Sequence, residues 1–291
     1  MSDTIELEKK ANSAARTLMG AVGWPTIILG VFCTSAYVVT LTLVATHQIN
    51  LAVAFAIVSL LTYAIYTVMH DAVHGSIQGK HKSFSWVNNG LGYLAGQILF
   101  ISFKVHQQEH LAHHRHTNQK DNDPDLFVKD DSLKSLIQGT LQVVFIQYHY
   151  FFSRSWKNTS TSDKTIILIE LVAMLAWRVA FVAAGYWLES LLLFVFGTLT
   201  GLFILVVLFV WLVHRPHDEV ARYKNTTTIL LPPLINGLVT RLWLFQNYHS
   251  VHHLFPRVPF YNYKKLFEQI EPIMVANHAP IVRIGKKLPH A

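Results

Sequence analysis

Three short histidine clusters in this sequence have the spacing of metal ligands. They read His70-Asp-Ala-Val-His74, His110-Leu-Ala-His113-His114 and His249-Ser-Val-His252-His253. Residues three or four positions apart lie on one face of a helix, so each cluster can direct its ring nitrogens to a common point. Neutral imidazole binds iron, zinc, copper and nickel. Clusters that meet in space would therefore form a nitrogen-rich metal site.

The number of clustered histidines favours two metal ions over one. Zinc sites usually take about four ligands, whereas the clusters supply eight histidines and a further candidate, His214, follows a long apolar run. The His-Glu-x-x-His pattern of zinc proteases and the Glu-x-x-His pairs of soluble di-iron bundles are both missing. A histidine-rich di-iron centre remains. Its predicted ligands are His70, His74, His110, His113, His114, His214, His249, His252 and His253.

Carboxylates near the clusters are candidates to hold the ligating rings in place. A carboxylate can accept the free ring N–H of a histidine and so fix its tautomer and orientation. The candidates are Asp71, Glu109, Asp123 and Asp125, although the Asp-Pro-Asp stretch is also a plain turn signal. Whether the neighbouring His106, His116 and His217 touch metal stays open.

Four long apolar runs must position these histidines. Of the 291 residues, 52% are hydrophobic and only 14% are charged, well below the roughly 25% typical of a soluble domain. Each run approaches the ~20 residues that cross a bilayer as a helix. Four such helices buried in a soluble core of this size are the disfavoured alternative. We predict an all-α integral membrane protein with two helical hairpins, whose spans cover about residues 24–46, 49–69, 165–187 and 190–213.

The basic residues predict how the spans are oriented. Of the 24 Lys and Arg residues, all but Arg178 lie before the first span, between the second and third, or after the fourth. The positive-inside rule then places both termini and all three histidine clusters in the cytoplasm. The net charge is +7. Basic residues beside membrane helices ordinarily contact anionic lipid headgroups, so this charge does not imply a nucleic-acid partner.

We predict one membrane domain over residues 23–291, with a histidine-rich cytoplasmic cap, behind a polar leader over residues 1–22. The apolar segment from Gly90 to Phe103 is too short to span and indicates an interfacial or re-entrant element. Pro232 and Pro233 break any helix that follows the fourth span. The third predicted span contains two charges, Glu170 and Arg178, roughly on one face. Charged residues inside a membrane span are by default assigned a function; an interfacial position and a structural pairing of the two residues are the alternatives.

The clusters resemble the histidine boxes of the membrane fatty acid desaturase and hydroxylase superfamily, in both pattern and order. The stretch from His113 to Asp125 is similar to the family's extended second box, and the resemblance covers about residues 50–265. It implies that the clustered histidines bind two irons together with one histidine after the last span, which His214 matches. In relatives of the stearoyl type, an asparagine four residues before that histidine also serves the metal site. Val210 occupies this position here, so any such ligand is absent or water-mediated.

The segment from Gln246 to Pro256, with Pro259 following, is similar to the third box of cyanobacterial-type β-carotene hydroxylases and of bacterial acyl desaturases near that branch. The resemblance implies an oxidoreductase that uses O2 and electrons from an external ferredoxin-like or cytochrome-type donor. The sequence lacks the haem-binding His-Pro-Gly-Gly motif, so no fused cytochrome domain is implied. Desaturation of a fatty acyl chain is the preferred function. Oxidation of a carotenoid ring and a non-catalytic metal-binding or transport role are the alternatives.

Overall fold

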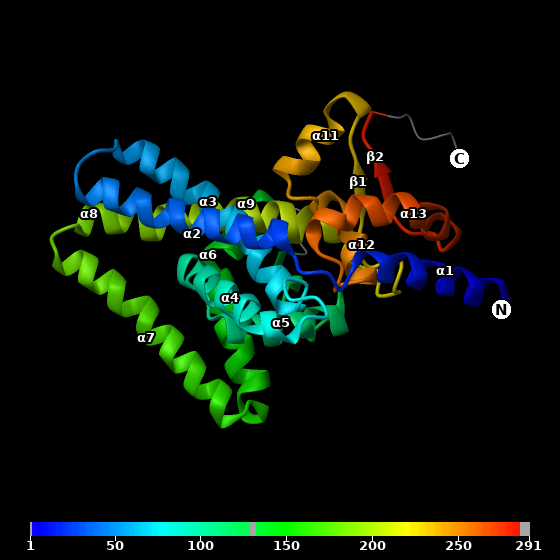
Figure 1. Ribbon diagram of the computed structural model, residues 1–291, viewed down its shortest axis with the longest axis horizontal. Helices are drawn as coiled ribbons and strands as arrows, with labels where there is room; N and C mark the ends of the chain where they lie inside the picture. The colour runs from blue at the N-terminus through cyan, green and yellow to red at the C-terminus, as the bar shows by residue number, and fades with distance from the viewer. Residues whose placement is uncertain (1, 129–131, 286–291) are drawn as a thin grey trace.

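The computed structural model describes residues 2–128 and 132–285 and is mostly helical (Figure 1). The helices are α1 (Ser2–Leu18), α2 (Trp24–Ala45), α3 (Leu51–Val73), α4 (Ser85–Leu99), α5 (Phe103–His116), α6 (Leu133–Tyr150), α7 (Thr161–Ala183), α8 (Trp187–Ser190), α9 (Thr198–Leu205), α10 (Leu212–His214), α11 (Pro233–Leu242), α12 (His249–Leu254) and α13 (Tyr263–Ala276). Two π-helical segments, Leu191–Gly197 and Val206–Trp211, join α8, α9 and α10 into one helix. Two short strands, β1 (Thr228–Leu230) and β2 (Ile281–Arg283), pair in parallel.

Among the residues that the structure describes, four helices are long and apolar enough to cross a membrane, as predicted. They are α2, α3, α7 and the continuous helix Trp187–His214. Figure 1 shows α2, α3 and α9 running together, whereas α7 diverges from them. The third span begins at Thr161 rather than near residue 165, because the Ser160 hydroxyl accepts a hydrogen bond from the Asp163 N–H and caps the first turn. The helical fold with four candidate spans is confirmed, while the two-hairpin arrangement and the orientation stay predictions.

Helix α3 is the centre of the bundle and packs against α2, α4 and α9. Nearly all of its second half is buried. The contact with α9 is close, since a Cβ atom on Gly201 would lie 2.5 Å from both the Ser59 carbonyl oxygen and Thr62 Cβ. The helix continues past residue 69, its predicted end, to Val73. His70 is therefore held in the packed core instead of in a loop.

The apolar segment that was predicted to be too short to span forms α4, a corner and the start of α5. Helix α4 packs against α2 and α3 and ends at Leu99; the next residue, Phe100, caps it in a left-handed conformation with φ of 60°. Ser102 then caps α5 by accepting a hydrogen bond from the Val105 N–H. This corner sets the direction of the helix that carries the second histidine cluster.

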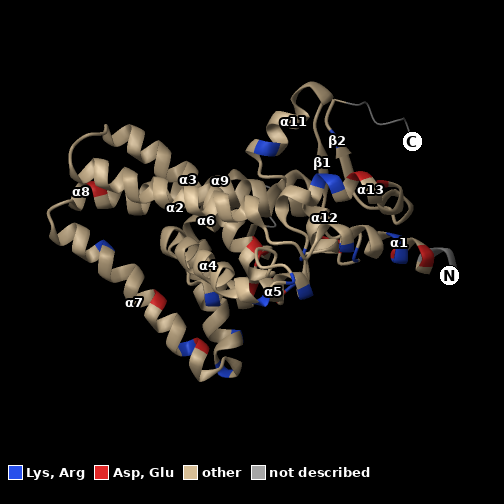
Figure 2. Ribbon diagram, viewed as in Figure 1, with Lys and Arg blue, Asp and Glu red and all other residues tan. Residues whose placement is uncertain are grey.

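The remaining elements form a cap at one end of the bundle (Figure 1). Helix α1 packs against α13, and the Asn262 amide donates to the Leu18 carbonyl at 2.9 Å. Pro232 and Pro233 were predicted to interrupt any helix after the fourth span, and helix α11 begins at Pro233. Figure 2 shows few charged residues along α2, α3 and α9, and more on the cap and α7. The polar and apolar parts of the chain are thus separated along the long axis.

Replacing Gly201 by leucine is expected to destabilise the bundle, because the new side chain would overlap Ser59 and Thr62 on α3. Overpacking of this kind typically costs about 1–3 kcal/mol. Gly90→Leu on α4 is the matched control, since nothing lies within 4 Å of a Cβ atom placed there. Thermal unfolding in detergent should show a lower midpoint for Gly201→Leu alone. Equal midpoints for the two variants would contradict the close α3–α9 contact.

Candidate metal centre

The three histidine clusters and His214 converge at the cap end of the bundle. His70 lies on α3 and His74 caps its C-terminus, the second cluster lies on α5, and the third lies on α12. His214 is the last residue of the fourth apolar helix. The spacing of three and four residues places the rings of each cluster on one helix face, as predicted. Four segments that are far apart in the sequence therefore supply one set of neighbouring imidazoles.

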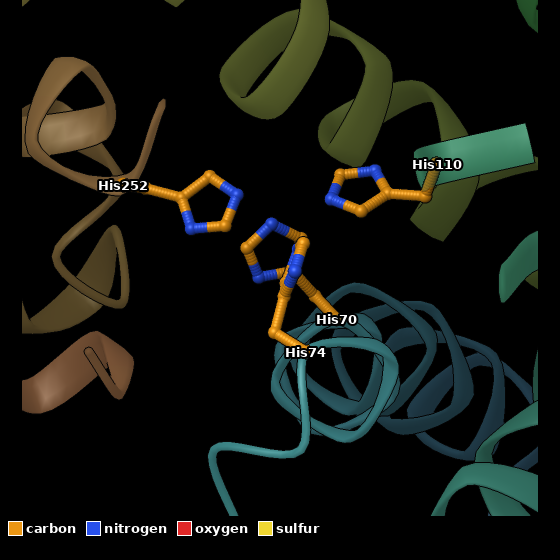
Figure 3. A group of neighbouring side chains, drawn as sticks. All are labelled: His70, His74, His110 and His252. Carbon is orange, nitrogen blue, oxygen red and sulfur yellow. The ribbon is translucent and has the colours of Figure 1, made fainter. Parts of the chain in front are cut away.

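Two groups of ring nitrogens form within this set. The first contains His70, His74, His110 and His252, and the second contains His113, His214 and His253. In each group, one ring nitrogen from every residue lies within 4.8 Å of the others. Figure 3 shows the rings of the first group directed toward one another. In the second, Nε2 of His113 lies 3.0 Å from Nε2 of His214 and 3.4 Å from Nε2 of His253.

His114 and His249 lie between the two groups. Nε2 of His114 is 2.8 Å from Nε2 of His252, and its ring stacks on His253 with centroids 4.4 Å apart. Nε2 of His249 is 3.2 Å from Nε2 of His253, and its ring centroid lies 4.8 Å from that of His214. All nine predicted ligands are thus brought into one cluster. Their binding of metal stays a prediction.

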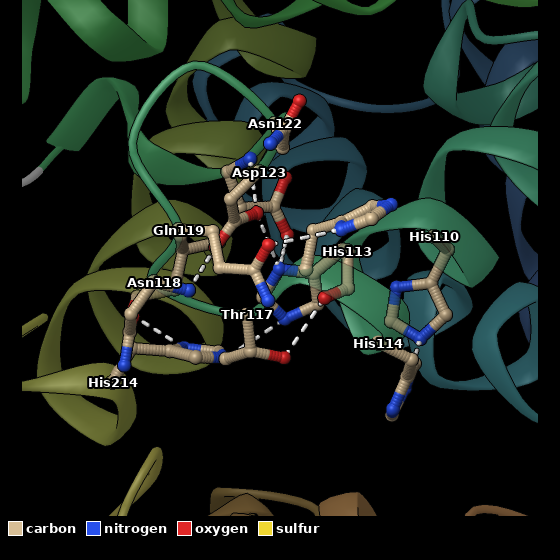
Figure 4. Close-up of polar contacts among 12 residues, drawn as sticks. His110, His113, His114, Thr117, Asn118, Gln119, Asn122, Asp123 and His214 are labelled. Carbon is tan, nitrogen blue, oxygen red and sulfur yellow. Dashed lines mark hydrogen bonds and ion pairs between the residues drawn. The ribbon is translucent and has the colours of Figure 1, made fainter. Parts of the chain in front are cut away.

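The His113 ring is held by a carboxylate network (Figure 4). Its Nδ1 lies 2.7 Å from Oδ1 of Asp123. The same Oδ1 accepts from the Asp125 N–H, and Oδ2 accepts from the Asn118 N–H. Burial alone would lower the pKa of His113, but Asp123 and Asp125 outweigh it and raise the pKa to about 9. A carboxylate can only accept, so Nδ1 carries a proton and Nε2 faces His214. Asp123 and Asp125 therefore lie where the sequence predicted a supporting role.

Four other rings are held at Nδ1 by partners that the sequence did not predict. His214 donates from Nδ1 to the Val210 carbonyl at 2.8 Å, so the backbone of the residue that the sequence comparison singled out holds this ring. The remaining three pairs are His249 with Gln246 Oε1 at 2.9 Å, His252 with the Tyr263 hydroxyl at 3.0 Å, and His253 with the Thr117 hydroxyl at 3.4 Å. Each contact leaves Nε2 directed into the cluster.

Helical spacing is the signal that could have found some of these partners. Gln246 precedes its histidine by three residues and Val210 precedes His214 by four, which places each pair on one helix face. Tyr263 gives no such signal, because it lies eleven residues from His252 on another helix. Only the folded chain brings that hydroxyl to the ring.

Asp71 and Glu109 do not support the clustered histidines as predicted. Asp71 accepts from the Thr26 hydroxyl at 2.8 Å and so joins α3 to α2. Glu109 is buried on α5, where burial and, secondly, Asp125 raise its pKa well above the ordinary range. Among the described residues, neither carboxylate is hydrogen-bonded to a clustered histidine. Each directly neighbours a candidate ligand in sequence, and adjacent side chains on a helix point about 100° apart.

His106, His116 and His217 lie outside both groups. His106 is buried and stacks on His110 with centroids 5.4 Å apart, while its Nδ1 lies 3.3 Å from Gln147 Oε1. His116 faces Gln119 at 3.1 Å. The His217 ring stacks on His214 with a centroid separation of 6.3 Å. These rings surround the cluster without joining either group of converging nitrogens.

The chemistry of the cluster fits bound metal. Burial, with added repulsion between neighbouring rings, lowers the pKa of six residues well below the ordinary range: His74, His110, His114, His249, His252 and His253. Neutral rings are the form that offers a lone pair to a metal. Both ring nitrogens of His70 and Nε2 of His74 are buried with no hydrogen-bond partner in the described structure. A buried polar atom without a hydrogen-bond partner destabilises the folded protein. A metal cation coordinated by these nitrogens would remove that penalty.

The chain is similar to known proteins over most of its length. A family model described as fatty acid desaturase matches residues 45–285. The sn-1 acyl-lipid omega-3 desaturase (ferredoxin) of Nostoc sp. (strain 36) is 26% identical over 242 residues, which cover 73% of this chain and 65% of that protein. The beta-carotene ketolase of Paracoccus sp. (strain PC1) is 29% identical over 223 residues, which cover 75% of this chain and 79% of that protein. The chain thus spans slightly less than two thirds of the Nostoc relative.

Asp123→Asn is expected to weaken metal retention, because the amide removes the negative charge that holds His113 with its Nδ1 protonated. Loss of such a supporting partner typically costs about 10–100-fold in metal affinity. Asp121→Asn is the matched control, since Asp121 is exposed and offers its backbone carbonyl, not its carboxylate, to Arg154. Competition with a chelator measures the affinity. Equal retention by both variants would contradict the role assigned to Asp123.

Proposed function

The chain belongs to the fatty acid desaturase family, and from this membership and the histidine geometry we propose that it is a membrane oxidoreductase that uses O2 to oxidise a C–H bond of a long-chain lipid. The observation that carries the proposal is the convergence of nine imidazoles, of which seven form two adjacent groups and His114 and His249 lie between them. A fatty acyl chain is the preferred substrate and desaturation the preferred reaction. The acyl-lipid desaturase of Nostoc supports this choice.

Two iron ions fit the two groups, with His114 and His249 available to both. When bound, they would supply the activation of O2 and the removal of hydrogen from an unactivated C–H bond. The chain contributes the geometry: Asp123, the Val210 carbonyl and Gln246 each fix the ring that they contact, so that its Nε2 points inward. Fixed rings would hold the ions in place while a substrate is positioned beside them.

The substrate would approach the centre from its apolar side. Tyr66 and Phe209 are buried next to His70, with ring centroids 6.0 and 6.3 Å from the His70 ring and 5.0 Å from each other. These buried apolar rings exclude water from the bundle side of the centre, and an apolar chain that approached from this side would meet them first. A displacement of about 1 Å can change a catalysed rate greatly. The shape of this layer would therefore decide which hydrogen is removed.

A carotenoid is the second candidate substrate. The Paracoccus protein that shares 29% identity with this chain is named as a beta-carotene ketolase, and a carotenoid ring oxidation would use the same metal groups. A non-catalytic or transport role is disfavoured by the position of the histidines. His70 lies near the end of α3 and His214 ends the fourth apolar helix, whereas transport sites lie near the middle of spans.

We further infer that both termini and the metal centre face the cytoplasm. The support is the absence of Lys and Arg from both turns between paired spans. A separate ferredoxin-like or cytochrome-type donor would supply electrons, and the Nostoc relative is named as a ferredoxin desaturase. The bilayer would contact the exposed apolar side chains of α2 and α7, such as Phe32 and Leu168. No nucleic-acid partner is proposed.

Expression in a bacterium that makes β-carotene should change the fatty acid profile and leave the pigments unaltered. Gas chromatography of fatty acid methyl esters and liquid chromatography of carotenoids measure the two outcomes. His114→Ala is the control and should reach the membrane in equal amount but give no product, because it removes a ring that contacts both groups. A new oxidised carotenoid with unchanged fatty acids would instead establish the second candidate.

Purified protein should contain about two irons per chain, one for each group of histidines. His113→Ala should lose iron and activity and still insert in the membrane, because every apolar helix stays intact. Elemental analysis and membrane fractionation measure these properties. A single zinc per chain, or normal iron and activity in His113→Ala, would refute the assigned centre.

A further inference from the structure

The two charged residues of the third candidate span do not pair with each other; they hold opposite sides of the corner between α4 and α5. We propose that Glu170 and Arg178 are positioning residues that fix the start of α5 and, through it, the direction of the second histidine cluster. The inference rests on the proposed function only in treating that cluster as a set of metal ligands.

Helix α7 meets the rest of the protein along a narrow stripe, and half of that stripe is charged. Its buried residues are Ile167, Glu170, Met174 and Arg178, which recur every three or four positions. Apolar residues such as Leu168 and Leu175 are exposed. Figure 2 shows how isolated the mid-helix charges of α7 are. Charges within a span are costly and are retained where they have a task.

Glu170 satisfies the first turn of α5. Its Oε1 accepts from the Phe103 N–H at 2.7 Å, and its Oε2 accepts from the Ser102 hydroxyl at 2.7 Å and from the Lys104 N–H at 3.4 Å. First-turn N–H groups have no partner within their own helix. A carboxylate at this end also complements the positive end of the helix dipole. In an apolar surrounding, Glu170 supplies what water would supply elsewhere.

Arg178 holds the other side of the corner. Its Nη2 donates to the Gln97 carbonyl in the last turn of α4 at 2.6 Å, where a cation complements the negative end of the helix dipole. The guanidinium also lies over three rings, at 4.2 Å from Trp177, 4.9 Å from Phe100 and 5.6 Å from Phe194. Phe100 is the left-handed residue at which the chain turns. Arg178 thus fixes the end of α4 and the turn itself.

The corner has little room to move. A Cβ atom on Gly96 would lie 2.6 Å from the Ile101 carbonyl oxygen and 3.3 Å from the Phe103 nitrogen. The Tyr148 hydroxyl on α6 accepts from the Ser102 N–H at 2.9 Å. His110 lies about two helical turns, or ~10 Å, beyond Phe103. A shift of the corner would therefore be transmitted along the rigid helix to the metal groups.

Hydrogen–deuterium exchange of the full-length protein tests the local step. Glu170→Ala should speed exchange of the first-turn amides of α5 about five- to tenfold, as expected for the loss of a helix cap. Glu189→Gln, a carboxylate change at α8, is the matched control and should leave those amides unchanged. Glu170→Gln keeps one acceptor oxygen and should give an intermediate effect. Arg178→Ala should speed amide exchange at the corner between α4 and α5, and Arg178→Lys should speed it less.

The rate of iron release to a chelator tests the link to the metal centre. Glu170→Ala should release iron severalfold faster than the Glu189→Gln control. Adding Ser102→Ala to Glu170→Ala should give less than the sum of the two single effects, because both act on one network.

Unchanged first-turn exchange in Glu170→Ala, or faster exchange spread evenly over all helices, would overturn the capping role. Locally faster exchange with unchanged iron release would overturn the coupling to the histidines. If the purified protein holds zinc, the proposed function fails, but the exchange result still decides this inference, since that measurement does not depend on which metal is bound.

Discussion

Nine imidazole rings share one largely buried volume at the end of four apolar helices, and this concentration of ring nitrogens constrains what surrounds it. The rings must be neutral to bind metal, and burial lowers the pKa of most of them. Each ring must also present its inner nitrogen, so its outer nitrogen needs a partner. His113 differs from the others, since burial would lower its pKa but the nearby carboxylates of Asp123 and Asp125 outweigh burial and raise it.

The histidines are held by three different physical means. His70 is fixed by packing, because α3 runs through the centre of the bundle. His214 is fixed within its own helix by the carbonyl of Val210. The second cluster depends on polar contacts, since α5 begins at a corner that Glu170 caps from another helix. Polar support of this kind is strong in an apolar surrounding, where no water competes for the N–H groups.

The histidine cluster lies at helix ends, and this position also bears on the proposed substrate. Within a bilayer, backbone groups must be satisfied inside a helix, so a site built from four segments forms where helices end and loops begin. One side of the centre then meets the apolar bundle through Tyr66 and Phe209, and the other meets the polar cap. Relatives at 26% and 29% identity are named for acyl-lipid and carotenoid chemistry. We expect the apolar layer, more than the histidines, to separate these substrates.

The sequence by itself determined the four apolar helices and the nine converging histidines, because length, hydropathy and spacing are local properties. It also named Asp123 as a candidate partner of a histidine, and Asp123 contacts His113, ten residues before it. It placed Asp71 wrongly, since spacing does not show toward which neighbour a helix face turns. Only the tertiary structure decided that His252 joins His70 while His253 joins His214, that Tyr263 orients His252, and that Glu170 caps a helix that begins 67 residues before it. Those pairings depend on how distant segments pack, which no short stretch of sequence contains.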